Sequence, residues 1–130
     1  MCGIFGSWHR SGGHCDPLEL DAFTDSLAHR GPDGRGTYLN EEVGIGLGHR
    51  RLAVIDLSED ASQPMRGVGE TWITYNGEIY NYIELRRELE SHSHDCLNQS
   101  DTEVILAAYA QWGVDCRRRF LDTAFWNGAP

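Results

Sequence analysis

The chain contains no lysine, and its eleven basic residues are all arginine. A Schiff-base lysine and the lysine of a phosphate-binding P-loop are therefore excluded within this sequence. Positive charge is also scarce overall, since 20 acidic residues give a formal net charge of −9. Phosphate backbones are bound by clustered positive charge, so we expect no nucleic-acid partner.

Long apolar runs are lacking as well. No stretch reaches the roughly 20 apolar residues of a membrane span, and no basic leader followed by an apolar run opens the chain. The four cysteines are scattered without a CxxC pair, unlike the framework of a small secreted domain. We therefore expect a cytoplasmic protein without a membrane segment, whose 130 residues form at most one domain.

Three stretches have the composition of β-strands. Residues 2–8, "CGIFGSW", are short and apolar, which predicts a buried first strand. Residues 36–55 predict further strands, and within them Val43, Ile45 and Leu47 alternate with glycines. "TWITYNG" at residues 71–77 predicts a strand that ends in an Asn-Gly turn.

Capping signals predict three helices. Their N-caps are followed three residues later by glutamate, in the pairs Asp16 and Glu19, Asn81 and Glu84, and Ser100 and Glu103. In the first helix Leu20, Phe23 and Leu27 recur at helical spacing, which predicts a core-facing stripe. The last two helices are expected to end near Ser91 and Trp112. Segregated strands and helices indicate an α+β fold rather than a doubly wound sheet.

Cys2 directly follows the initiator methionine. If Met1 is removed, this residue carries both a thiol and a free α-amino group. The amine is partly free base at neutral pH and can take the thiol proton, directly or through water. Cys2 is therefore a candidate N-terminal nucleophile, although a chance Met-Cys start is the more common explanation of such a sequence.

Three other motifs suit the chemistry of such a nucleophile. In "YNGEIYN" the Asn76 amide and the Gly77 N–H could stabilise an oxyanion, or form an ordinary hairpin turn. In "GHRRLAVID" one of two neighbouring arginines could bind a substrate carboxylate, while alternation points the other to the opposite face. Asp101 in "SDTEVIL" could bind an α-ammonium group, or only stabilise its helix N-terminus.

Two further motifs favour less specific explanations. His92, His94 and Cys96 alternate as zinc ligands could, but a fourth ligand is not obvious, so we interpret them as a polar strand or loop and predict no metal site. "SGGHCD" at residues 11–16 resembles a phosphate loop, but Asp16 and Glu19 in the following helix would repel phosphate. We therefore predict no cofactor in this chain.

Together the motifs resemble the glutaminase domain of class II glutamine amidotransferases, above all its asparagine-synthetase branch. The matching stretches are "MCGIFG", "HRGPDG", "GLGHRRLAVIDLS", "QPM", "YNGEIYNYIELR" and "SDTEVIL", in the family's order from Cys2 to about Trp112. The resemblance implies an N-terminal-nucleophile hydrolase fold, a sandwich of antiparallel sheets flanked by helices. It also implies that Cys2 releases ammonia from L-glutamine and leaves glutamate.

The resemblance also assigns roles to residues. Asn76 and Gly77 would form the oxyanion hole, and Arg51 would hold the carboxylate of glutamine while Arg50 points away. The other implied binding residues are Leu52 and Val54, through their backbones, and Glu78 and Asp101, which would contact the α-amino group. Arg30 and Asp33 in "HRGPDG" are expected to be scaffolding around the site.

The sequence departs from the family after Phe120. The family continues with a "GMFAF"-like core strand, whereas this chain reads "LDTAFWNGAP". We therefore expect residues 1–130 to be a partial glutaminase domain with an incomplete sheet. The ATP-binding synthetase domain, which would use ATP and Mg²⁺ to make asparagine from aspartate, is expected to be absent. The alternatives are an inactive remnant that at most binds a partner, and the glutaminase domain of another amidotransferase.

Overall fold

The computed structural model of the chain describes residues 1–10, 13–54 and 58–120. The residues form two compact units. The first, called here the sheet unit, comprises the described residues of Met1–Val54, Ser62–Pro64 and Thr74–Asn76. The second, the helical unit, comprises the described residues of 55–61, 65–73 and 77–130. Predictions for the end of the strand at Ile55 and for the tail after Phe120 lie outside the described residues.

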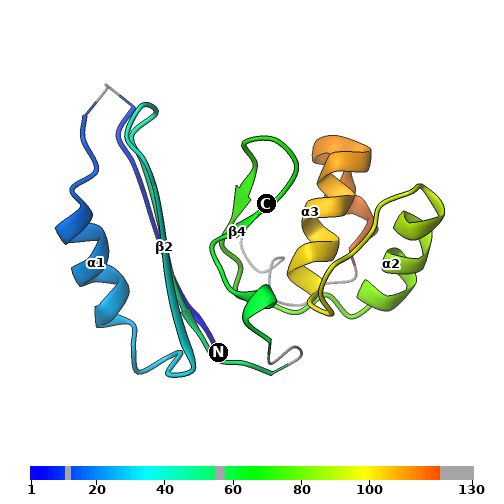
Figure 1. Cartoon of the computed structure of the whole chain (residues 1–130), viewed down its shortest axis with the longest axis horizontal. Helices are drawn as coiled ribbons and strands as arrows, with labels where there is room; N and C mark the ends of the chain where they lie inside the picture. Colours follow the sequence, from blue (N-terminus) through cyan, green and yellow to red (C-terminus); the bar gives the residue numbers. More distant parts are fainter. Residues whose placement is uncertain (11–12, 55–57, 121–130) are drawn as a thin grey trace. The chain divides into compact units, whose positions relative to one another are not determined.

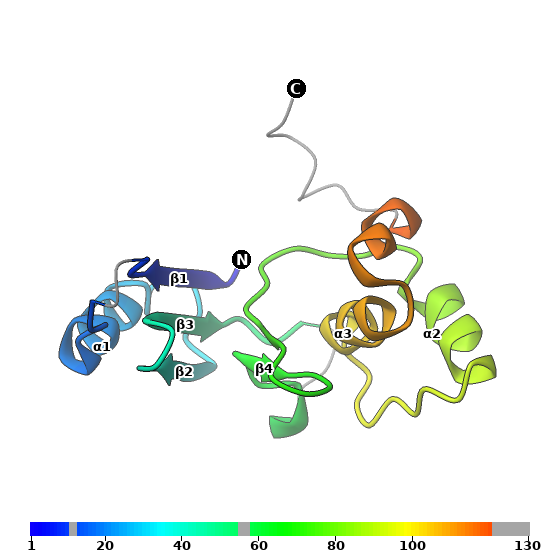
Figure 2. The ribbon, with the colours of Figure 1, turned by 90° about the horizontal axis from the view of Figure 1, so that it is seen from above.

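The sheet unit contains a three-stranded antiparallel sheet in the order β1-β3-β2 (Figures 1 and 2). The strands are β1 (Gly3–Trp8), β2 (Gly34–Asn40) and β3 (Ile45–Arg51). In the register, Gly3 lies opposite Arg50 and Gly34 lies opposite Arg51. The central strand β3 therefore brings the two arginines of "GHRRL" to the end of the sheet where β1 begins.

Helix α1 (Pro17–Ser26) covers one face of this sheet (Figure 1). As predicted, Asp16 caps it, since its carboxylate accepts the Leu18 N–H at 2.8 Å. Thr24 is fully buried and lies against Gly48 of β3, where a Cβ atom would overlap the Thr24 hydroxyl. The glycines that alternate in β3 thus allow the helix to approach the sheet closely.

The predicted apolar stripe of α1 is wrong in one position. Leu20 is buried, but Phe23 is 52% exposed and stacks on Phe5 with 4.9 Å between ring centroids. The polar Thr24 occupies the buried position instead, and its hydroxyl donates to the Leu20 carbonyl at 2.7 Å. A threonine can be buried there because the preceding turn of the helix satisfies its hydrogen bond.

The predicted strands differ from the observed ones in burial and length. The first strand is present, but Ile4 and Trp8 are exposed, so the strand is not buried on both faces. The third predicted stretch is mostly not a strand. Only Trp72–Ile73 forms β5, which pairs with β4 (Met65–Arg66) in a short antiparallel hairpin.

The helical unit contains α2 (Tyr82–Ser91) and α3 (Asp101–Trp112), with the 3₁₀ helices η1 (Glu59–Ala61) and η2 (Gly113–Arg119). Its core includes apolar side chains of both α-helices and of the segment before α2, namely Ile79, Leu85, Leu89, Val104 and Ala108. The predicted start of α3 is confirmed, because the Ser100 hydroxyl accepts the Glu103 N–H at 3.2 Å.

Two details of the predicted capping differ from the structure, one at α2 and one at α3. Asn81 stands at the N-cap of α2 but makes no capping bond, and its amide donates to the Arg119 carbonyl at 2.8 Å. The Glu103 carboxylate accepts the N–H groups of Leu97 and Asn98 rather than closing a capping box on Ser100. Local capping rules therefore predict where these helices begin, but they do not predict which groups the Asn81 and Glu103 side chains bind.

The observed elements confirm an α+β fold with antiparallel sheets and helices. Among the described residues, none of the helices is long and apolar enough to cross a membrane.

Candidate functional site

Cys2 is held by the backbone that follows β3. The Leu52 N–H points at the Cys2 sulfur, with 3.3 Å between nitrogen and sulfur, and the Leu52 carbonyl lies 3.6 Å from the same sulfur. Cys2 directly precedes β1, which pairs with β3, so the sheet register places its side chain at this point. Met1, which precedes Cys2, is 77% exposed.

The other three cysteines lie in different surroundings. Cys15 is buried, and its sulfur is 3.2 Å from the Ser7 hydroxyl. Burial raises the pKa of both the Cys96 and the Cys116 thiols, which disfavours the thiolate that a nucleophile requires. Among the four thiols, only Cys2 combines partial exposure with a place at the start of the chain.

The two arginines of β3 have different environments. The Arg50 side chain lies on the α1 side of the sheet, where it donates to the Gly31 carbonyl at 3.3 Å and approaches the Asp25 carboxylate at 3.5 Å. Side chains alternate along a strand, so Arg51 belongs to the opposite face. Leu52 and Val54 follow β3, and the Val54 side chain is 74% exposed.

Asp33 supports the backbone around Arg51, as a scaffolding role predicts. Its N–H donates to the Arg51 carbonyl at 2.9 Å, and its carboxylate accepts the Ala53 N–H at 3.0 Å. These two bonds flank Leu52, the residue whose backbone contacts Cys2. The "HRGPDG" motif therefore positions the backbone that faces the sulfur.

A buried histidine lies on the same face of β3 as Arg51. His49 is 1% exposed, and neither ring nitrogen has a hydrogen-bond partner among the described residues. Burial, and secondly the charge of Arg51, lower the pKa of His49 to about 4. Sequence reasoning did not single out this residue, because a histidine next to two arginines in a strand carries no signal of its burial.

Asn76 ends the last segment of the sheet unit, and Gly77 begins the adjoining segment of the helical unit. Asn76 follows Tyr75, which is 4% exposed. The Tyr75 N–H donates to the side-chain oxygen of Gln63 at 2.6 Å. Gln63 belongs to the "QPM" motif, so two of the quoted motifs are joined by a hydrogen bond within the sheet unit.

Asp101 and Glu78 belong to the helical unit. Asp101 is the first residue of α3 and is 5% exposed, and its carboxylate accepts the Ile79 N–H at 3.1 Å. Burial raises the pKa of Asp101, backbone N–H donors such as that of Ile79 oppose the rise, and the charge of Glu78 adds to it. Two neighbouring carboxylates, one of them buried, form a place where a bound cation would be stabilised.

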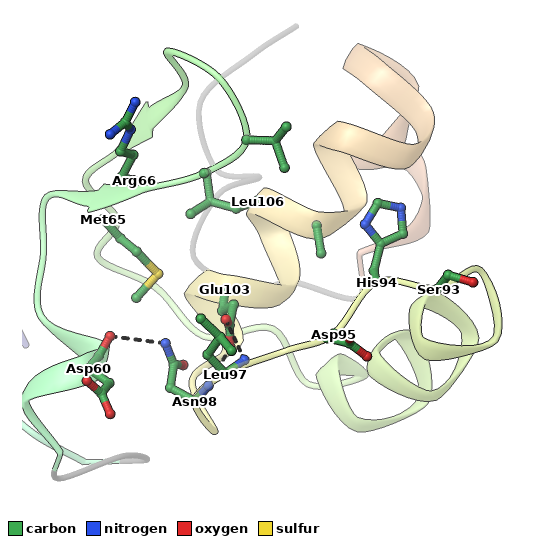
Figure 3. A pocket seen from close by; sticks show the side chains of 13 residues that line it. Asp60, Met65, Arg66, Ser93, His94, Asp95, Leu97, Asn98, Glu103 and Leu106 are labelled. Atoms are coloured by element: carbon green, nitrogen blue, oxygen red, sulfur yellow. Dashed lines mark hydrogen bonds between the residues drawn. The ribbon is translucent and has the colours of Figure 1, made fainter.

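The helical unit also contains a pocket of about 430 Å³ that none of the predicted site residues lines (Figure 3). It lies between the β4 hairpin, the loop after α2 and α3, and its walls include Met65, Leu97 and Leu106. In Figure 3 the Glu103 carboxylate is already engaged by the backbone of the loop. No group of three or more potential metal ligands occurs in residues 1–10, 13–54 and 58–120.

The predicted site residues thus fall into two sets. The sheet unit contains five of them, and in it Cys2 contacts Leu52 directly. These five are Cys2, Arg51, Leu52, Val54 and Asn76. Gly77, Glu78 and Asp101 belong to the helical unit, where the charge of Glu78 acts on Asp101.

Comparison with known proteins gives the family. A family model described as a glutamine amidotransferase domain matches residues 1–125. Asparagine synthetase [glutamine-hydrolyzing] 1 of Bacillus subtilis (strain 168) is 45% identical over 86% of this chain and 18% of its own length. Asparagine synthetase [glutamine-hydrolyzing] 3 of the same organism is 41% identical over 89% of this chain and 19% of its own length.

A relative with a different name is the amidase chry2 of Gibberella zeae, which is 34% identical over 88% of this chain and 18% of its own length. The chain therefore belongs to the glutamine amidotransferase domain family. It spans about a fifth of the length of the curated relatives it matches.

Proposed function

We propose that this chain is a glutaminase domain in which Cys2, freed of Met1, hydrolyses the side-chain amide of glutamine. The observation that carries the proposal is the contact between the Cys2 sulfur and the Leu52 N–H, at 3.3 Å. It holds the partly exposed thiol of Cys2 beside the end of β3, next to Arg51 in the sequence. The membership of the family supports the choice of glutamine as substrate.

The reaction proceeds in two halves. The α-amine of Cys2 takes the thiol proton, and the sulfur attacks the amide carbon, whose C=O electron pair moves onto oxygen. When the tetrahedral intermediate collapses, the C–N bond breaks and the leaving ammonia takes the proton from the α-ammonium. Water then attacks the thioester, the C–S bond breaks, and glutamate and the free thiol result. The net reaction converts glutamine and water into glutamate and ammonia.

The other residues of the site have electrostatic roles in this proposal. The Asn76 amide and the Gly77 N–H donate to the oxyanion of the tetrahedral intermediate. The Arg51 guanidinium binds the substrate carboxylate through two parallel hydrogen bonds. Glu78 and Asp101 bind the α-ammonium group, whose positive charge would favour the ionised form of the buried Asp101 carboxyl that burial and the charge of Glu78 disfavour.

The destination of the ammonia is part of the proposal. The asparagine-synthetase relatives favour an ATP-dependent and Mg²⁺-dependent synthetase domain that aminates aspartate, with residues 1–130 as a partial domain of the N-terminal-nucleophile hydrolase fold. We propose no cofactor for this chain itself, because a cysteine nucleophile and its own amine suffice for the hydrolysis. The differently named amidase relative favours a second candidate, in which the chain is the glutaminase domain of another amidotransferase and the ammonia serves a different acceptor.

Intact mass spectrometry and a glutamate-release assay on the purified chain test the proposal. The expected result is a mass lacking Met1 together with glutamate formation from glutamine. A variant that retains a residue before Cys2 should be inactive, because its amine then belongs to the wrong residue. A processed and folded chain that releases no glutamate would contradict the proposal and favour an inactive remnant.

A further inference from the structure

The Gln63 side chain joins two segments of the sheet unit, one of which ends at the candidate oxyanion donor Asn76. Two short segments, Ser62–Pro64 and Thr74–Asn76, belong to this unit although the β4–β5 hairpin between them belongs to the other. Gln63 lies in the first segment and Tyr75 in the second. Their contact therefore holds together the two ends of the hairpin at the point where it leaves the sheet unit.

The register of the hairpin explains why this contact forms. Met65 lies opposite Ile73 in the β4–β5 pair. Gln63 and Tyr75 each stand two residues beyond that pair, so the same register places them opposite each other. The described strands have already ended there, and the Gln63 side-chain oxygen takes the Tyr75 N–H at 2.6 Å. The side chain supplies an acceptor where the ladder of backbone bonds stops.

The backbone of Gln63 is itself fixed against the sheet. Its carbonyl lies so close to Gly36 that a Cβ atom at Gly36 would overlap it. Gly36 lies opposite His49 in the β2–β3 pair, and His49 lies opposite Ile4 of β1. The segment that carries Gln63 therefore packs against β2, on the face of the sheet opposite α1.

We propose that Gln63 is a positioning residue for the glutaminase reaction, which holds Asn76 in place by binding the N–H of Tyr75. The inference rests on the proposed function, in which Asn76 donates to the oxyanion. Gly36 fixes Gln63, Gln63 fixes Tyr75, and Tyr75 precedes Asn76. The position of Asn76 is thus fixed relative to the sheet whose first strand follows Cys2. A misplacement of about 1 Å can cost roughly 100-fold in rate, so such a device would affect turnover.

A matched pair of substitutions in the complete chain tests this role. Gln63→Met keeps the length of the side chain but removes the acceptor oxygen, whereas Gln63→Glu keeps an acceptor. We expect Gln63→Met to lower kcat by roughly 10- to 100-fold with KM changed less than about 3-fold, because the oxyanion exists only along the reaction path. Gln63→Glu should restore most of the rate. Equal losses in both variants, or a loss confined to KM, would overturn the proposal.

A double-mutant cycle with Asn76→Ala separates this inference from the proposed function. If Gln63 acts through Asn76, Gln63→Met should cause little further loss in the Asn76→Ala background. Full activity of Asn76→Ala would contradict the proposed oxyanion role. A strong loss in Asn76→Ala with a normal rate in Gln63→Met would contradict only the positioning role, as would fully additive losses.

Amide hydrogen exchange measures the contact without turnover. The Tyr75 N–H should exchange at least about 10-fold faster in Gln63→Met than in the parent chain or in Gln63→Glu, because the open fraction of that bond increases. Unchanged exchange at Tyr75 would overturn the inference even if the parent chain proved inactive. An inactive parent chain with the expected exchange pattern would contradict the proposed function alone.

Discussion

In the sheet unit Cys2 is held by the backbone of Leu52, whereas in the helical unit Asp101 is held by burial at the start of α3 and by the Ile79 N–H. The first arrangement leaves Cys2 only partly buried. The second makes Asp101 part of the core of its unit. A substitution of Cys2 should therefore abolish activity with little change in the free energy of unfolding, whereas a substitution of Asp101 should change both.

The largest expected effect is the loss of activity on substitution of Cys2. If this loss did not occur, the proposed difference between Cys2 and Asp101 would be wrong. Cys2→Ala should reduce glutamate release to background, a loss of at least about 10⁴-fold, because no other group supplies the nucleophile. The thermal midpoint should change by no more than a few degrees, since the residue is only partly buried. The activity assay and circular dichroism measure the two effects on the same preparation.

Cys15→Ala is the control in the same unit. Cys15 is buried against Ser7 and Gly46, so its replacement should lower stability and leave the rate per folded molecule unchanged. Glutamate release by Cys2→Ala at the parental rate would exclude Cys2 as the nucleophile.

The next effect distinguishes the two faces of β3. Arg51→Ala should raise KM for glutamine by roughly 100-fold, about 3 kcal/mol, because the substrate carboxylate loses its partner. Arg50→Ala removes the contacts to Gly31 and Asp25 and should cost at most about 1 kcal/mol of stability, without a change in KM. Steady-state kinetics of both variants checks the assignment. Equal increases in KM would show that the two faces are not functionally distinct.

The third prediction concerns the pH dependence of the sheet unit. The pKa of His49 is lowered to about 4 in the folded chain, from the ordinary histidine value of 6.5. Between these values the unfolded chain binds a proton that the folded chain does not. The free energy of unfolding should therefore fall as the pH falls from about 6.5 to 4, by up to about 3 kcal/mol, and not change further through His49 below that range.

The control for this effect is His49→Leu, which removes the titrating imidazole ring. Its stability should not show the His49 contribution between pH 6.5 and 4. Hydrogen exchange at β3 and α3 amides would assign the loss to the sheet unit. If the parent and His49→Leu lost stability in parallel over this range, His49 would not be the group responsible.

The smallest expected effect is at the N-cap of α3. Ser100→Ala removes the acceptor of the Glu103 N–H and should lower the free energy of unfolding of the helical unit by about 1 kcal/mol. Denaturant unfolding followed by circular dichroism measures the change. Ser100→Thr keeps the hydroxyl and should recover most of it. A loss as large in the threonine variant would mean that packing, not capping, matters at this position.

Local patterns in the sequence determined where the helices begin and what kind of fold results. Asp16 and Ser100 cap their helices as predicted, because a capping side chain and its N–H partner lie within three residues of each other. The motifs from Cys2 to Trp112 also sufficed to indicate the family, since reactive residue types in a characteristic order are a property of the chain itself.

Tertiary structure alone decided which partners the side chains found. Thr24 rather than Phe23 is buried because Gly48 leaves room for it. The strand at β5 stops after two residues, and Gln63 reaches Tyr75 across twelve positions of sequence. Likewise His49 is buried without a polar partner among the described residues. Such contacts depend on how distant segments pack, and the free energy of packing outweighs the local preferences that a sequence pattern reveals.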